Sequence, residues 1–402
     1  MVFNSKALLQ NKFIILSFGI IAMLSMGTIF SWSALRIPLE KTISITPMQS
    51  GFPFLVFLAL YSFSMPFAGK LIEKYKPHYI AIVGSILMSL GYILSGYCTS
   101  LIELIFTYGV IGGLGVGTLY GVPIAMASRW FPKRRGLAIG LTLLGFGISP
   151  LITAPVISFL IEHYGVFYSF KIIGILYICL LPLVSLVLRN PIDYNHKVQL
   201  AVESFKTIST SKTKSFYSLW LLLFISSFSG LLTIGISSPF SQDVLHINNA
   251  TAAFVVSLFA LFNGIGRLSF GVFVDKIGLH KSLLYAFILL TISSLLVAIL
   301  PFNSSILFVI SLAIIWCVFG GTLSMAPLSV IVLFGENNSS RNYGKLFTAY
   351  GCGAIVGVLL VSKIKEITGS YQSIYYLIFT LSLIGLGIIF SLFKSQEIRT
   401  KL

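Results

Sequence analysis

The clearest indication of the fold is the stretch Gly271-Val-Phe-Val-Asp275-Lys276-Ile-Gly278-Leu-His280-Lys281. It covers the end of one apolar run, 251–273, and the short polar loop that leads to the next run, 282–300. Each run has about 20 residues, the length that a helix needs to cross a bilayer. A weaker copy, Gly69-Lys-Leu-Ile-Glu73-Lys74, follows another apolar run 202 residues earlier. A repeat at about half the chain length predicts two structurally similar halves.

The composition places the whole chain in a membrane. Of its 402 residues, 9% are charged and 56% are hydrophobic, and the mean hydropathy is +0.97. A soluble domain carries roughly 25% charged residues. These values exclude a soluble enzyme, a disordered scaffold and a nucleic-acid-binding protein, although the net charge is +16.

The apolar runs predict an all-α polytopic membrane protein with twelve transmembrane helices in two six-helix halves. Barrel strands are excluded because they span only ~10 residues of alternating polarity. The longest polar stretch divides the chain into an N-terminal half, 1–190, a cytoplasmic linker, 191–217, and a C-terminal half, 218–402. The twelve predicted runs are 13–34, 49–69, 79–98, 101–127, 137–161, 166–188, 218–240, 251–273, 282–300, 305–333, 344–362 and 373–393.

The lysines and arginines predict the orientation, because cytoplasmic loops of membrane proteins carry an excess of them. With the N-terminus in the cytoplasm, 21 of the 27 basic residues fall in cytoplasmic segments and 5 in outer segments. We therefore expect a multi-pass protein of the cell membrane with both termini in the cytoplasm. The one basic residue left over is Arg267, which lies inside a span.

Arg267 predicts a binding site for an anion. It lies eight residues before Asp275, roughly 12 Å from the helix end at 1.5 Å per residue. Burying a cation there costs at least ~2.5–3.5 kcal/mol, so it should face a watery cavity and meet anions. Asn263 is one turn earlier on the same helix face and could orient the guanidinium. A snorkelling arginine or ordinary helix packing are the alternatives.

The repeated loop predicts a gating device. A glycine lets two helices approach closely, and an acidic residue can cap a neighbouring helix N-terminus or pair with a base. Such contacts can hold one conformation shut and break in another. The residues concerned are Gly69, Glu73, Gly271, Asp275, Lys276 and Gly278.

The spans lack the groups that other mechanisms need. All eleven acidic residues and all five histidines lie in loops or at helix ends. We therefore expect no mid-membrane proton relay, no metal site, no cofactor and no intramembrane enzyme. The glycine repeats at Gly113, Gly117 and Gly121 indicate close helix packing and not a phosphate loop, since no GK[ST] follows.

These motifs resemble the major facilitator superfamily, and within it the oxalate/formate antiporter family and its monocarboxylate-transporter relatives. The resemblance runs through most of the chain. It implies the major facilitator fold and a central cavity lined by Phe30, Tyr120, Arg267, Phe319, Phe347 and Tyr350. The motifs that carry it are Phe30-Ser-Trp32, Gly115-Val-Gly117-Thr-Leu-Tyr120-Gly121, Arg129-Trp-Phe-Pro132, Asn263-Gly-x-x-Arg267 and Ser340-Arg341-Asn-Tyr-Gly344.

Three departures from the family pattern bear on the substrate. Tyr350 stands where the oxalate carriers have a lysine, and Leu323 stands where they have a cavity tyrosine. Asn263 stands where eukaryotic monocarboxylate carriers have an aspartate. One cavity cation instead of two favours a substrate with one carboxylate.

The sequence therefore predicts a secondary active transporter of a small organic anion, a monocarboxylate such as lactate, pyruvate or formate. It would work as a monomer by alternating access, with proton symport or anion exchange, and with Arg267, Asn263 and Tyr120 binding the carboxylate. The alternatives are an oxalate/formate-type dicarboxylate antiporter and a facilitator-family exporter of hydrophobic compounds. A channel or a receptor has no supporting motif.

Overall fold

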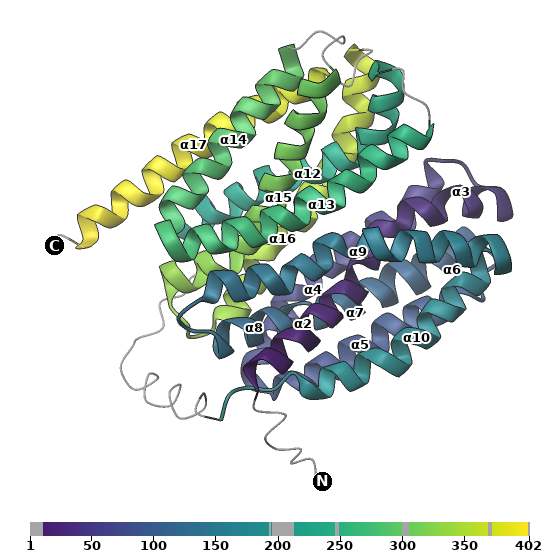
Figure 1. Cartoon of the computed structure of the whole chain (residues 1–402), viewed down its shortest axis with the longest axis horizontal. Helices are drawn as coiled ribbons and strands as arrows, with labels where there is room; N and C mark the ends of the chain where they lie inside the picture. Colours follow the sequence, from purple (N-terminus) through teal and green to yellow (C-terminus); the bar gives the residue numbers. More distant parts are fainter. Residues whose placement is uncertain are drawn as a thin grey trace.

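Helices are the only regular secondary structure in the part of the chain that the structure describes. A computed structural model describes residues 11–192, 194, 213–245, 249–299, 305–368 and 372–400. In Figure 1 the helices form two bundles, one coloured purple to teal and one green to yellow. The prediction of an all-α polytopic fold is confirmed.

Six spans make up the N-terminal bundle, and two of them are irregular. The first span has a 3-10 turn at Gly27–Ser31, and the fourth has a π-helical segment at Ile105–Gly112. A π segment inside a helix often marks a functional site. The elements are α2 (Lys12–Met26), η1 (Gly27–Ser31), α3 (Trp32–Thr42), η2 (Gln49–Gly51), α4 (Phe52–Lys74), α5 (Pro77–Ser95), α6 (Leu101–Leu104), η3 (Ile105–Gly112), α7 (Gly113–Leu119), α8 (Gly121–Trp130), α9 (Arg135–Tyr164) and α10 (Val166–Val187).

The C-terminal bundle contains six long helices. They are α12 (Lys214–Leu245), α13 (Asn249–Ile277), α14 (Leu279–Ile299), α15 (Ser305–Phe334), α16 (Ser339–Thr368) and α17 (Ser373–Thr400). In the described residues, ten helical segments of the two bundles are long and apolar enough to cross a membrane. The division at 190 and 217 remains a prediction.

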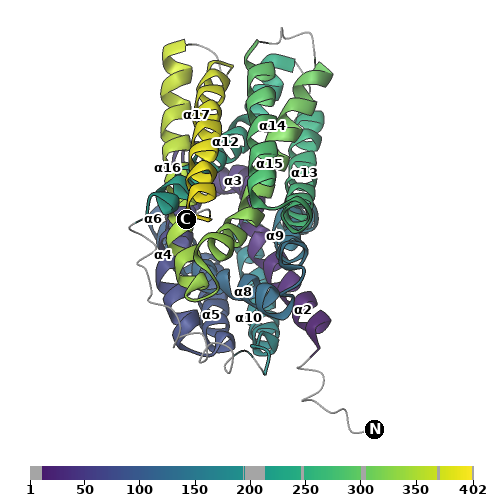
Figure 2. The ribbon, with the colours of Figure 1, turned by 90° about the vertical axis from the view of Figure 1, so that its left-hand side faces the viewer.

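Two helix pairs join the bundles. α9 packs along α13, and α4 packs along α16, so each pair takes one helix from each bundle. Figure 1 and Figure 2 show α9 and α13 side by side where the bundles meet. A Cβ added at Gly271 would overlap the backbone oxygen of Gly136, and one at Gly344 would overlap that of Met65. Glycines therefore permit backbone-to-backbone contact in both pairs.

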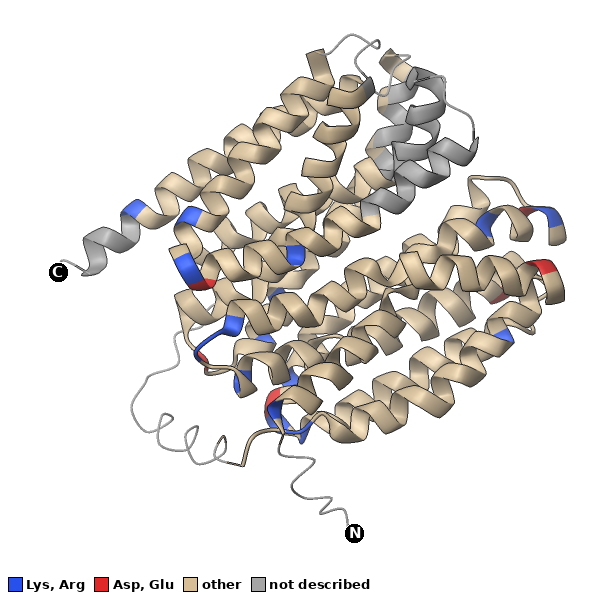
Figure 3. Cartoon of the chain, in the orientation of Figure 1, with Lys and Arg blue, Asp and Glu red and all other residues tan. Residues whose placement is uncertain are grey.

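The charges are distributed unevenly along the helix axes. Figure 3 shows most lysines and arginines at the end of the molecule where α9 begins. We call this the basic end and define it by residues 70–76, 129–135 and 276–281. Figure 3 shows fewer lysines and arginines near the opposite end, where α3 lies in Figure 1. This one-sided pattern agrees with the distribution expected for cytoplasmic loops.

Candidate functional site

Arg267 is fully buried at the interface of the two bundles. Its exposed fraction is 0%, and its Nε donates a hydrogen bond to Asn263 Oδ1 at 2.9 Å. Nη1 donates to the backbone oxygen of Leu143 in α9 at 3.4 Å. The guanidinium carbon lies 5.2 Å from the ring centroid of Phe146, so the ring covers one face of the cation. Nη2 is buried and has no hydrogen-bond partner among the described residues.

No carboxylate of the described residues neutralises Arg267. Three ion pairs form in this part of the chain, and they join Arg36 to Glu40, Arg129 to Glu73 and Arg135 to Glu336. Asn263, the polar neighbour of Arg267, is itself only 1% exposed and donates to the backbone oxygen of Trp316 at 3.4 Å. An uncompensated buried charge is costly, and an anionic ligand would relieve that cost.

Aromatic rings from both bundles form a cluster that is connected to this cation through Phe146. Tyr350 stacks on Phe347 at 4.9 Å between centroids and on Phe319 at 6.3 Å. Tyr120 lies 5.4 Å from Phe347 and 5.3 Å from Phe146. Each of these five side chains is at most 1% exposed.

Phe30 belongs to the same cluster. It is located in the 3-10 turn of the first span and contacts Phe146 edge to face at 5.4 Å. A Cβ at Gly27 in that turn would overlap the backbone oxygen of Phe146. The structure thus brings all seven predicted substrate-binding residues into one cluster. Their role as ligands stays a prediction.

Sequence reasoning missed three residues of the cluster. Phe146 connects Phe30 and Tyr120 to Arg267, Tyr61 lies 5.1 Å from Tyr120, and Tyr343 lies 5.6 Å from Phe347. The repeat contained a signal for one of them. Tyr61 precedes Asn263 by 202 residues, the same spacing that relates Gly69 to Gly271.

The acidic residue of each repeated motif lies in the last turn of a helix, and not in a loop as predicted, and it caps a helix of the opposite bundle. Asp275 accepts hydrogen bonds from the backbone N–H groups of Gly136 and Leu137, both at 2.8 Å, at the start of α9. Glu73 accepts from the backbone N–H of Ser340 at 2.8 Å, at the start of α16. A carboxylate at a helix N-terminus is stabilised by free N–H groups and by the helix dipole. Both caps join the two bundles at the basic end, and their part in gating stays a prediction.

Arg129 connects the Glu73 cap to the start of the predicted linker, at Asn190 and Tyr194. Its Nη2 lies 3.1 Å from Glu73 Oε2, and its Nη1 donates to Asn190 Oδ1 at 2.9 Å. The guanidinium carbon is 4.4 Å from the centroid of the Tyr194 ring. Burial raises the pKa of the Tyr194 phenol although the Arg129 charge opposes that shift. The phenol therefore stays neutral and can stack on the arginine as an uncharged ring.

The other predicted gating residues have different surroundings. A Cβ at Gly69 would overlap the backbone oxygen of Ser340, so this glycine permits the α4–α16 contact. Gly278 has φ = 84°, a left-handed conformation that favours glycine and ends α13. Lys276 is exposed and takes part in none of the three ion pairs of the described residues. Its part in gating stays a prediction.

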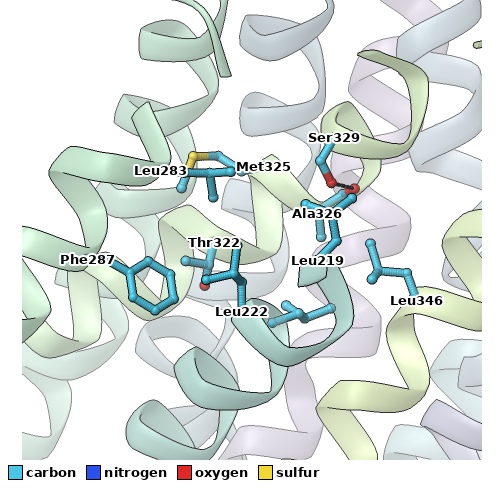
Figure 4. Close-up of a pocket in the computed structure, with 10 residues that line it drawn as sticks. Leu219, Leu222, Leu283, Phe287, Thr322, Met325, Ala326, Ser329 and Leu346 are labelled. Atoms are coloured by element: carbon cyan, nitrogen blue, oxygen red, sulfur yellow. Dashed lines mark hydrogen bonds between the residues drawn. The ribbon is translucent and has the colours of Figure 1, made fainter. Parts of the chain in front are cut away.

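A cavity in the C-terminal bundle lies apart from this cluster. It has a volume of about 20 Å³, and none of the predicted site residues lines it. Figure 4 shows apolar side chains around it, with Thr322 and Ser329 as the polar ones. The Ser329 hydroxyl donates to the backbone oxygen of Ala326. A space of this size holds about one water molecule and is no candidate for the substrate site.

Comparison with known proteins identifies the fold and its relatives. The sequence model of the Major Facilitator Superfamily matches residues 16–357 and 219–401. The structure is similar to the crystal structure of FucP in the outward conformation, with a TM-score of 0.66 and 13% identity over 93% of this chain and 97% of that one. FucP is the fucose:proton symporter of Escherichia coli.

Two curated relatives cover most of the chain. The oxalate:formate antiporter of Oxalobacter formigenes is 29% identical over 361 residues, which cover 88% of this chain and 85% of the relative. Monocarboxylate transporter 13 of Bos taurus is 24% identical over 342 residues, which cover 83% of this chain and 78% of the relative. Both similarities extend through the two bundles.

Proposed function

Since the chain belongs to the major facilitator superfamily and is a multi-pass membrane transporter, we propose that it carries small organic anions by secondary active transport. The observation that supports this best is Arg267, a buried cation between the two bundles with no carboxylate partner among the described residues. The named substrates of the antiporter and monocarboxylate relatives are of the same chemical class.

The substrate of this proposal is a monocarboxylate. A guanidinium binds one carboxylate through two parallel N–H···O bonds. The position that could supply a second charge holds Tyr350, whose ring stacks on those of Phe347 and Phe319. Arg36 is engaged near the opposite end, where it pairs with Glu40 at 3.1 Å. A second carboxylate of a substrate bound to Arg267 would therefore be unpaired.

The second candidate function is a dicarboxylate antiporter. It is supported by the similarity to the oxalate:formate antiporter. The two candidates differ in how the substrate charge is balanced. Proton symport would bring a cation with the anion, and exchange would replace one anion by another. Asn263 has no titratable group, and exchange of one anion for another requires none beside Arg267.

Alternating access would use the two caps as a lock. With Asp275 and Glu73 each bound to a helix of the opposite bundle, the basic end is closed. We place this end in the cytoplasm, with both chain termini, because of its lysines and arginines. The described state would then be closed to the cytoplasm, and breaking both caps would open the site on that side.

Uptake by proteoliposomes tests the proposal. Purified protein would be reconstituted and supplied with radiolabelled formate, lactate, pyruvate and oxalate, with and without a pH gradient and with and without internal anion. We expect saturable uptake of at least one monocarboxylate that is lost in Arg267→Gln. Uptake of none of the four anions, or full activity of Arg267→Gln, would contradict the proposal.

A further inference from the structure

The hydroxyl of Tyr350 is a buried hydrogen-bonding group that the fold leaves unused. Tyr350 is 1% exposed, and its Oη has no hydrogen-bond partner among the described residues. Its ring is nearly parallel to those of Phe347, at 15°, and Phe319, at 13°. The stacking holds the ring in one plane and so fixes where the hydroxyl points. An unpaired buried hydroxyl is costly, so a ligand atom there would be favourable.

The guanidinium of Arg267 is restricted in how it can bind a carboxylate. Its single Nε–H is donated to Asn263, which excludes the side-on fork that uses Nε and Nη2. Nη1 gives one hydrogen to Leu143, and Nη2 has both of its hydrogens available. A carboxylate must therefore bind end-on, through Nη1 and Nη2.

The Tyr350 hydroxyl and the Nη1 and Nη2 groups of Arg267 belong to the same cluster of residues. The Tyr350 ring stacks on Phe347, and Phe347 packs against Tyr120. Tyr120 packs against Phe146, the ring that covers Arg267. Tyr350 supplies a neutral donor there, whereas Arg267 supplies the only full charge in this cluster. A substrate that satisfies both groups has one carboxylate and one uncharged oxygen close to it.

We propose that Tyr350 is a specificity-determining residue that donates a hydrogen bond to an uncharged oxygen on the carbon next to the substrate carboxylate. The inference rests on the proposed transport of monocarboxylates and narrows it to 2-hydroxy and 2-oxo acids. An alkyl acid of the same size would leave the Tyr350 hydroxyl buried without a partner. Sites built to bind a substrate oxygen reject analogues that lack it, and we expect a preference of about tenfold or more.

The test compares two acids that differ by one oxygen. Initial uptake of radiolabelled lactate and propanoate by proteoliposomes gives a ratio of kcat/KM that does not depend on the amount of active protein. The unmodified protein should favour lactate by about tenfold or more. Tyr350→Phe removes only the hydroxyl and keeps the stacked ring, so the ratio should fall to within about threefold of unity while propanoate uptake remains.

A matched control is Tyr92→Phe. Tyr92 is equally buried, but its neighbours are Tyr108, Tyr177 and Phe170 and not Arg267. The Tyr92→Phe variant should have the same ratio of kcat/KM for lactate to kcat/KM for propanoate as the unmodified protein. A ratio near unity in the unmodified protein, or an unchanged ratio in Tyr350→Phe, would overturn the inference while Arg267-dependent uptake of both acids kept the proposed function. Uptake of formate without uptake of lactate or propanoate would overturn the inference alone, and absence of uptake of formate, lactate, pyruvate and oxalate would overturn both.

Discussion

The carboxylate of Asp275 and the backbone N–H of Gly136 lie 2.8 Å apart although 139 residues separate them in the chain. Glu73 and Ser340 form the corresponding contact between the other helix pair, also at 2.8 Å. The two contacts are alike because the halves repeat each other. Each joins the last turn of a helix in one bundle to a helix start in the other, so two contacts connect the bundles at the basic end.

Asp275→Asn should weaken the contact between Asp275 and the start of α9. Asparagine keeps a single acceptor oxygen and no charge, so one N–H of α9 loses its partner and the helix dipole loses its counter-charge. We expect a loss of about 1–2 kcal/mol, which is roughly 5–30-fold in the equilibrium between closed and open. Amide hydrogen exchange of residues 136–140 should speed up accordingly. Lys281→Gln, an exposed neighbour, should leave it unchanged.

Gly271→Ala should impair the α9–α13 contact more than its size suggests. The added Cβ would overlap the backbone oxygen of Gly136, which cannot move without moving the helix. Overpacking of this kind costs about 1–3 kcal/mol. We expect a lower melting temperature in detergent and slower transport. Gly387→Ala is the matched control, because a Cβ there meets nothing within 4 Å. Equal effects of the two substitutions would argue against the close contact.

Arg267→Lys should reduce transport at least tenfold while the protein still inserts and folds. Lysine keeps the charge but loses the two parallel donors and the planar face that lies over Phe146. Initial uptake rates, normalised to the reconstituted protein, measure the effect. Arg134→Lys makes the same exchange at an exposed arginine and should be neutral. Near-normal uptake by Arg267→Ala would mean that the cation serves packing and not binding.

Tyr350→Lys should make the carrier more tolerant of oxalate. A second carboxylate without a partner costs several kcal/mol in a desolvated site, and a penalty near 3 kcal/mol is roughly 100-fold in affinity. A lysine beside Arg267 would pair with that carboxylate and reduce the difference in affinity between monocarboxylates and oxalate. Competition assays measure this difference in affinity, and Tyr350→Phe controls for loss of the hydroxyl. Tight oxalate binding by the unmodified protein would contradict the preference for one carboxylate.

The orientation can be checked by labelling from outside intact cells. In a variant without the four native cysteines, Met48→Cys near the end opposite the basic end should react with an impermeant maleimide. Lys133→Cys at the basic end should react only after permeabilisation. Both positions are exposed, so a difference in labelling reports the side of the membrane. The opposite result would invert the proposed orientation.

The sequence alone predicts the fold well because lipid imposes a simple rule on it. A span needs length and apolarity, and both can be read along the chain without knowing any contact. The first span shows the limit of this approach. The run 13–34 continues as helix to Thr42, past Arg36 and Pro38, because a polar helix end can extend beyond the bilayer core.

The candidate site is predictable only in part. Arg267 stands out because a charge inside a span is rare, and Asn263 follows from helical spacing. Phe146 does not stand out, since one phenylalanine among 34 carries no signal of its own. Its position over Arg267 results from the close approach of α9 and α13, where Gly147 leaves room for the arginine side chain. Such contacts between distant segments are absent from local sequence patterns.

The lone charge of Arg267 gives the proposed carrier an electrical character. Loaded with a monovalent anion, the site is neutral, whereas the empty site carries one positive charge. Exchange of one such anion for another would therefore move no net charge across the membrane. Net uptake requires the empty carrier to return, and the membrane potential acts on its charge with up to about 2.3 kcal/mol per 100 mV. The same arginine that selects an anion would make one-way flux depend on voltage.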